Sequence, residues 1–103
     1  MSEEAIVKNA ADEEQVKKAG EREKRGRDQD LSDLRRILET DNGRRFIWKT
    51  LVHCGIFTSS FTGNNTTFFN EGRRDVGLKI LADVMEAKPD AYTQMAQDAK
   101  RGE

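Results

Sequence analysis

Apolar residues are most concentrated between Gly43 and Gly55, which we predict to be the central helix of the fold. At about 100° per residue, the apolar side chains of this stretch cover most of the helix circumference. They are Phe46, Ile47, Trp48, Leu51, Val52 and Cys54. Asp41 or Asn42 can cap the first turn, and Gly55 suits the left-handed conformation that follows a last turn. Because a helix this apolar is buried on several sides, we expect the rest of the core to pack against it.

Three further segments have helical periodicity: one begins near Asp30, one covers residues 67–88, and one begins at Pro89, which suits the first position of a helix. Their apolar positions are Leu31, Leu34, Ile37 and Leu38; Phe69, Val76, Gly77, Ile80, Leu81, Val84 and Met85; and Tyr92, Met95, Ala96 and Ala99. The connection over residues 55–66 is unusually long. Its side chains expected to contact the core are Ile56, Phe57 and Phe61. The pattern predicts an all-α fold, with a compact domain of three to four helices over residues 30–100.

Residues 1–29 form a charged N-terminal arm with few large apolar side chains. Such a segment cannot bury enough surface to offset the entropy that it loses on ordering. Its Ala, Glu, Lys and Gln residues favour helix, which we expect to be interrupted at Gly20 and Gly26. We therefore predict a polar arm that is partly disordered or helical. Its functional interpretation is a segment that folds on a partner.

A short sequence echo predicts how two helices pair. Gly43-Arg44-Arg45 recurs as Gly72-Arg73-Arg74, and on this alignment Trp48 matches Gly77. We expect the two helices to start alike and to pack together, with the indole of Trp48 lying where Gly77 has no side chain. The predicted structural core comprises Phe46, Trp48, Leu51, Cys54, Phe57, Phe69, Val76, Gly77 and Ile80.

Composition narrows the function classes. The 103 residues suit one small domain, in which 35% of residues are apolar and 36% are charged. The net charge is −1 and neither half of the chain is strongly basic, which argues against nucleic-acid binding driven by overall charge. The single cysteine excludes an internal disulfide and a cysteine-rich zinc site. No signal peptide or membrane-spanning apolar run is visible, so we expect a protein of a reducing cytosol or of a particle assembled there.

Arg44 and Arg73 fall within the apolar sectors of their predicted helices, in a first turn where positive charge opposes the helix dipole. One interpretation is an internal ion pair, or stacking on an aromatic ring. The candidate acids are Asp33, Glu39, Asp41 and Glu71. The other is a shared anion- or partner-binding site that also includes Arg45 and Arg74. We expect at least one buried pair, with Arg73 the better candidate because the aromatic loop before it would exclude water.

The residue chemistry gives no support for catalysis. His53 and Cys54 are neighbours in sequence, so on a helix their side chains point about 100° apart and cannot act as base and nucleophile on each other. His53 is the sole histidine, which leaves no second imidazole for a metal site. Phosphate-loop and nucleophile-elbow motifs are absent. We therefore predict no catalytic residues, no metal and no cofactor, in a protein that is not an enzyme.

The order of motifs resembles one known family. A leucine-bearing helix leads into Asn42-Gly43-Arg44-Arg45, which is followed by His53-Cys54-Gly55-Ile56-Phe57, by Glu71-Gly72-Arg73-Arg74-Asp75 and by Pro89-Asp90-Ala91-Tyr92. Over residues 30–100 this pattern is similar to the small tailed-bacteriophage domain family that is named after a gene product of a Bordetella phage. The charged arm lies outside the similarity.

The resemblance implies a small helical phage protein with no catalytic residues. It favours a virion-associated protein, either an accessory of the head, portal or tail or an internal protein that is ejected, which docks to a larger assembly. The alternative is a small phage protein that binds and inhibits or redirects a host factor. The expected partners are phage structural proteins or a host protein, the expected location is the virion or the host cytoplasm, and self-association into an oligomer is compatible with both.

Overall fold

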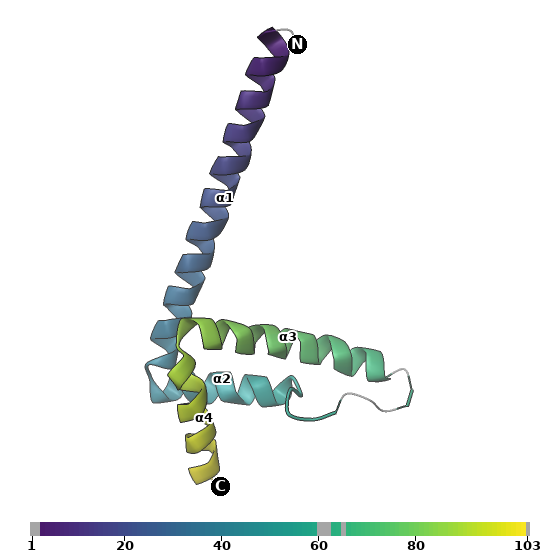
Figure 1. Cartoon of the computed structure of the whole chain (residues 1–103). Helices are drawn as coiled ribbons and strands as arrows, with labels where there is room; N and C mark the ends of the chain where they lie inside the picture. The colour runs from purple at the N-terminus through teal and green to yellow at the C-terminus, as the bar shows by residue number, and fades with distance from the viewer. Residues whose placement is uncertain (1–2, 60–62, 65, 103) are drawn as a thin grey trace. The chain divides into compact units, whose positions relative to one another are not determined.

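The computed structural model describes residues 3–59, 63–64 and 66–102, with side chains described from residue 9 onwards. These residues form four α-helices and no strand: α1 (Glu3–Leu38), α2 (Asp41–His53), α3 (Thr66–Ala87) and α4 (Pro89–Arg101), as Figure 1 shows. The predicted all-α fold is confirmed. Pro89 occupies the first turn of α4, as predicted, because its missing N–H and fixed φ suit that position.

Helix α1 is continuous through Gly20 and Gly26, so the expected interruption at these glycines is wrong. The helix start expected near Asp30 is wrong as well. Each glycine costs about 1 kcal/mol relative to alanine, which the good helix formers around it offset. An i,i+4 ion pair between Glu14 and Lys18, at 3.4 Å, adds a small stabilisation.

By its internal contacts the chain divides into two units, Met1–Asp30 and Leu31–Glu103. In the first unit the side chains from residue 9 onwards are almost all exposed, including Val16. A helix that is polar all round gains little from tertiary packing. Whether the division predicted at residues 29 and 30 separates an arm from an independently folding domain stays a prediction.

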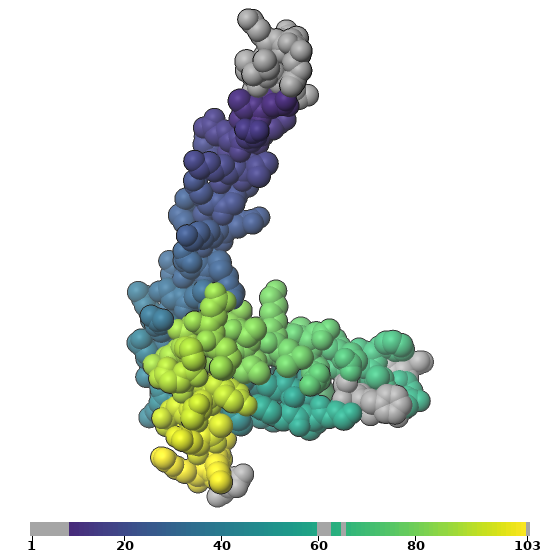
Figure 2. Space-filling view, viewed as in Figure 1, coloured from purple at the N-terminus to yellow at the C-terminus, as the bar shows by residue number. Residues whose placement is uncertain are grey.

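The core lies in the second unit, where α2, α3 and α4 pack against one another and the last turns of α1 contribute Leu38. Its buried side chains are Leu38, Ile47, Leu51, Cys54, Ile56, Val84, Ala87, Ala91 and Met95. Figure 2 shows the yellow surface of α4 lying directly against the green and teal surfaces of α3 and α2. The Arg35 Nε atom donates a 3.0 Å hydrogen bond to the Ala87 carbonyl and so joins the end of α1 to the end of α3.

The predicted core is correct in part. Leu51, Cys54 and Gly77 are buried, and Trp48 and Ile80 are half-buried against the core. Four other residues predicted for the core are exposed, which corrects that expectation. They are Phe46 (70%), Phe57 (47%), Phe69 (69%) and Val76 (57%). Their helical periodicity placed these residues on the apolar faces of their helices. In so small a bundle, however, the neighbouring helices cover only the central stripe of each apolar face, and residues at its edges stay in solvent.

The helix pairing at Gly77 also differs from the prediction. A Cβ atom on Gly77 would lie 2.5 Å from the Cys54 Cβ and 2.5 Å from the Ile56 Cγ2, so the absent side chain admits the corner after α2. Trp48 packs elsewhere, with ring centroids 5.1 Å from Phe57 and 6.1 Å from Tyr92. The expected contact between Trp48 and Gly77 is therefore wrong.

The turn between α1 and α2 is closed by Thr40, and not by the predicted caps Asp41 or Asn42. The Thr40 hydroxyl accepts a 2.9 Å hydrogen bond from the Gly43 N–H. This bond supplies a partner for an N–H group of the first turn that has none within the helix. A Cβ atom on Gly43 would lie 1.8 Å from the Ile37 carbonyl oxygen, so only glycine fits there. Gly72 has open space around its Cα and lies inside α3, which shows that the two Gly-Arg-Arg sequences do not mark equivalent helix starts.

Candidate functional site

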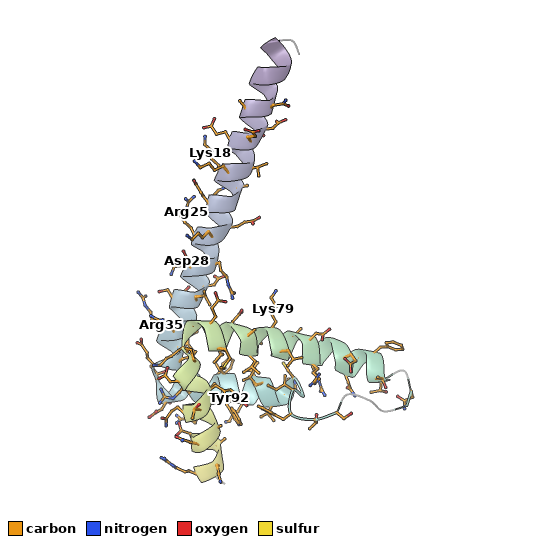
Figure 3. The ribbon with its side chains drawn as sticks, in the orientation of Figure 1. Lys18, Arg25, Asp28, Arg35, Lys79 and Tyr92 are labelled. Atoms are coloured by element: carbon orange, nitrogen blue, oxygen red, sulfur yellow. The ribbon has the colours of Figure 1, made fainter. Side chains whose placement is uncertain are left out.

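An open groove of about 670 Å³ lies between α2 and α4. Its residues are Asp41, Arg44, Arg45, Trp48, Lys49, Met95, Asp98, Ala99, Arg101 and Gly102. Figure 3 labels Tyr92 on α4 near the side where that helix meets α2, and the Tyr92 ring contacts Trp48 from the same helix pair. The groove therefore joins an aromatic floor to a charged rim.

Arg44 lies at the base of this groove and is 15% exposed. Its Nη1 atom donates a 2.9 Å hydrogen bond to the Leu38 carbonyl, and its Nη2 atom forms an ion pair with Asp41. The Nε atom lies 3.9 Å from the Asp98 carboxylate and, although buried, forms no hydrogen bond within the part of the chain that the structure describes. Arg44 thus links the end of α1, the first turn of α2 and α4. The pair with Asp41 was one predicted alternative, whereas Asp98 was not foreseen.

Three further cations form the rim. Arg45 is exposed, and its Nη2 atom donates to the Asn42 side-chain oxygen. Lys49 follows Arg45 by one helical turn on α2, and Arg101 lies in the last turn of α4. Sequence reasoning identified Arg45 but missed Lys49 and Arg101. The i,i+4 spacing of Arg45 and Lys49 was visible, but α4 had to be placed before Arg101 could be assigned to the same groove.

Arg73 and Arg74 belong to a different part of the molecule. Arg73 is exposed, its guanidinium carbon lies 6.0 Å from the Phe69 ring centroid, and its Nη2 atom lies over Gly55. The expectation that Arg73 is the better-buried arginine is wrong, because its surroundings are open to solvent. Phe61, which was expected to help exclude water, lies outside the described residues. Arg74 is half-buried, and its Nε atom has no hydrogen-bond partner among the described residues.

The predicted site shared by Arg44 and Arg73 is not formed. Arg44 lies in the first turn of α2, whereas Arg73 lies over Gly55, beyond its last turn. The nine helical steps from Arg44 to His53, the last residue of α2, alone span roughly 14 Å at 1.5 Å per residue. Arg44 and Arg45 therefore lie at the groove, whereas Arg73 lies near the corner after α2.

The groove offers binding chemistry through its cations and its apolar floor. Neither His53 nor Cys54 is among its lining residues. In the ranges given above, no group of three or more His, Cys, Asp or Glu side chains is placed to hold a metal ion. None of the helices there is both long and apolar enough to cross a membrane.

Comparison with known proteins identifies a family but no individual relative. The family model of the Bbp19-like phage protein matches residues 34–97, which include the core, the groove up to residue 97, and both arginine pairs. No curated protein and no solved structure matches the chain. The charged arm lies outside the match, as the sequence pattern indicated. Because the match covers more than half of the chain, the protein belongs to the Bbp19-like phage protein family.

Proposed function

We propose that this phage protein acts without catalysis, as a virion-associated protein that docks to a larger assembly. Family membership supports the phage origin. The docking role rests on one observation: three phenylalanines lie largely in solvent, namely Phe46, Phe68 (80% exposed) and Phe69. Large aromatic side chains dominate the energetics of protein interfaces. In a chain with seven aromatic residues, exposing three of them points to contacts with another protein.

The area available is sufficient for part of a specific interface. Each aromatic side chain buries about 150–250 Å² when it is fully covered. Phe68 and Phe69 together would supply roughly half of the 800 Å² per partner that is typical of a stable complex. Phe68 and Phe69 lie next to each other in the first turn of α3, at the end of that helix away from α4 (Figure 1).

Quantitative mass spectrometry of purified particles of the encoding phage tests this proposal. The expected result is a fixed number of copies per particle that survives density-gradient purification in high salt. A non-structural protein of the same phage serves as the control for carry-over. Copies no more abundant than that control would contradict the virion-associated role, and recovery of the protein bound to a host factor would favour the alternative.

A double substitution at the exposed aromatics tests the docking surface. Phe68→Ser with Phe69→Ser should reduce the copies per particle, because the apolar area is lost while no core contact changes. Lys79→Ser, at an exposed position of the same helix, is the matched control. Equal copy numbers for both variants, with unchanged thermal melts, would remove these phenylalanines from the interface.

A further inference from the structure

The groove between α2 and α4 is positively charged on a chain that is slightly negative. Its residues include four cations and two carboxylates, whereas the whole chain has a net charge of −1. Two of these charges are already engaged, since Arg44 pairs with Asp41. No ion pair is formed to Arg45, Lys49 or Arg101 among the residues that the structure describes. The rim therefore presents uncompensated positive charge to a ligand.

The groove also has an apolar floor. Trp48 is half-buried and leaves part of its surface in the groove, and Met95, with 2% of its surface exposed, lines the groove as well. The Trp48 ring packs against Phe57 and Tyr92, which restricts its rotation before a ligand arrives. A rigid aromatic floor lowers the entropy cost of binding. An occupant should therefore carry an apolar group as well as negative charge.

The spacing of the cations matches the spacing of carboxylates on a helix. Arg45 and Lys49 are separated by one turn of α2, a rise of about 6 Å. Carboxylates at i and i+4 of a helical ligand have the same separation. Arg101 contributes from α4, across the groove from α2. A ligand with acidic residues on both sides of an apolar residue would place its carboxylates against the cations of the rim and its apolar side chain against Trp48.

The charges favour a protein segment over a nucleic acid. Asp41 and Asp98 lie in the groove, where they would repel a continuous phosphate backbone. A protein segment can position its few carboxylates away from both aspartates, whereas the evenly spaced phosphates of a nucleic acid cannot avoid them.

We propose that this groove binds an acidic, amphipathic segment of a partner protein. Carboxylates spaced one helical turn apart pair with Arg45 and Lys49, an apolar side chain lies on Trp48, and a further carboxylate reaches Arg101. The inference rests on the proposed docking function and names the chemistry of one partner contact. It concerns a surface different from the exposed Phe68 and Phe69.

The test uses a synthetic helical peptide of about four turns, with glutamates at i and i+4 on either side of a leucine. Trp48 is the sole tryptophan of the chain, so its fluorescence reports directly on the groove. We expect a saturable change in Trp48 emission, with an affinity that falls as salt rises. A peptide with lysines for the glutamates, and one with serine for the leucine, should each bind at least about tenfold more weakly.

Charge reversal locates the site. Arg45→Glu with Lys49→Glu should weaken binding by about tenfold or more, because both positions would then repel the glutamates. Arg36→Glu with Lys79→Glu, at exposed positions outside the groove, makes the same change in net charge and should leave the affinity within about twofold. Thermal melts of both variants verify that the fold is retained.

Three results would overturn the proposal: no change in Trp48 emission at millimolar peptide, equal weakening by the two double variants, or tighter binding of a thymidine oligonucleotide than of the peptide. These results are separate from those of the particle experiment. A protein that is present in particles but does not bind the peptide keeps its docking role and loses this site. A protein that binds the peptide but is absent from particles keeps the site and loses the virion role.

Discussion

Gly77 lies against Cys54 so closely that a Cβ atom at position 77 would come within 2.5 Å of the Cys54 Cβ. This contact sets the distance at which α3 passes the C-terminal end of α2. The corner itself depends on Gly55, whose φ of +75° places it in the left-handed region that glycine adopts without strain. The predicted left-handed turn at Gly55 is confirmed. The absence of a side chain at Gly77 makes room for Cys54, and not for Trp48 as predicted.

Gly77→Leu should destabilise the domain by about 1–3 kcal/mol, because the new side chain would push α3 away from the corner formed by Cys54 and Ile56. Gly72→Ala is the matched control on the same helix, where a Cβ atom meets nothing within 4 Å. That change should stabilise by up to about 1 kcal/mol through helix propensity. Chemical denaturation measures both free energies of unfolding, and equal effects would contradict the close approach at Gly77.

Trp48→Ala should cost about 3 kcal/mol, near the lower end for large aromatic truncations, because the ring is only half-buried. It removes the contacts with Phe57 and Tyr92. Phe46→Ala, two residues earlier on the same helix, should change stability by less than about 0.5 kcal/mol since Phe46 is mostly in solvent. Thermal melts measure both changes. An equal decrease in melting temperature for the two variants would show that Phe46 is covered in solution, as in an oligomer.

The two arginines of the sequence echo should respond differently to loss of charge. Arg44→Gln should destabilise by about 1–3 kcal/mol, because it weakens the link to the Leu38 carbonyl and leaves Asp41 and Asp98 without a cation. Arg73→Gln should stay within about 0.5 kcal/mol, since that side chain is exposed. Urea titrations of both variants provide the comparison. A larger effect at Arg73 than at Arg44 would restore the buried pair expected from the sequence.

Removal of residues 1–27 should leave a cooperatively folding domain. The described side chains of this segment contribute nothing to the core, so their loss exposes no apolar surface. The truncated chain should lose helical circular dichroism in proportion to the residues removed and keep its thermal transition. A broad, non-cooperative melt would show that the first unit stabilises the second, and would disprove the predicted boundary.

The sequence by itself determined the helices of the second unit and most of their ends. Leu51, Pro89 and Gly55 carry strong local signals, since apolar periodicity, a fixed proline φ and a left-handed glycine act within a few residues. The family could also be predicted from the sequence, because the resemblance depends on the order of such motifs along the chain. The course of α1 differs from the prediction, because the helix formers around Gly20 and Gly26 outweigh the cost of the two glycines.

Only the tertiary structure decided which part of each apolar sector is buried and which charges meet. Phe46 and Ile47 are neighbours on the same apolar helix, yet Phe46 is exposed and Ile47 is buried, because the positions of α3 and α4 select the covered stripe. Arg101 joins Arg45 through the placement of α4, across more than 50 residues of chain. Local periodicity describes one helix at a time. The groove is a property of two helices, and its position depends on side-chain packing between segments that the sequence does not place side by side.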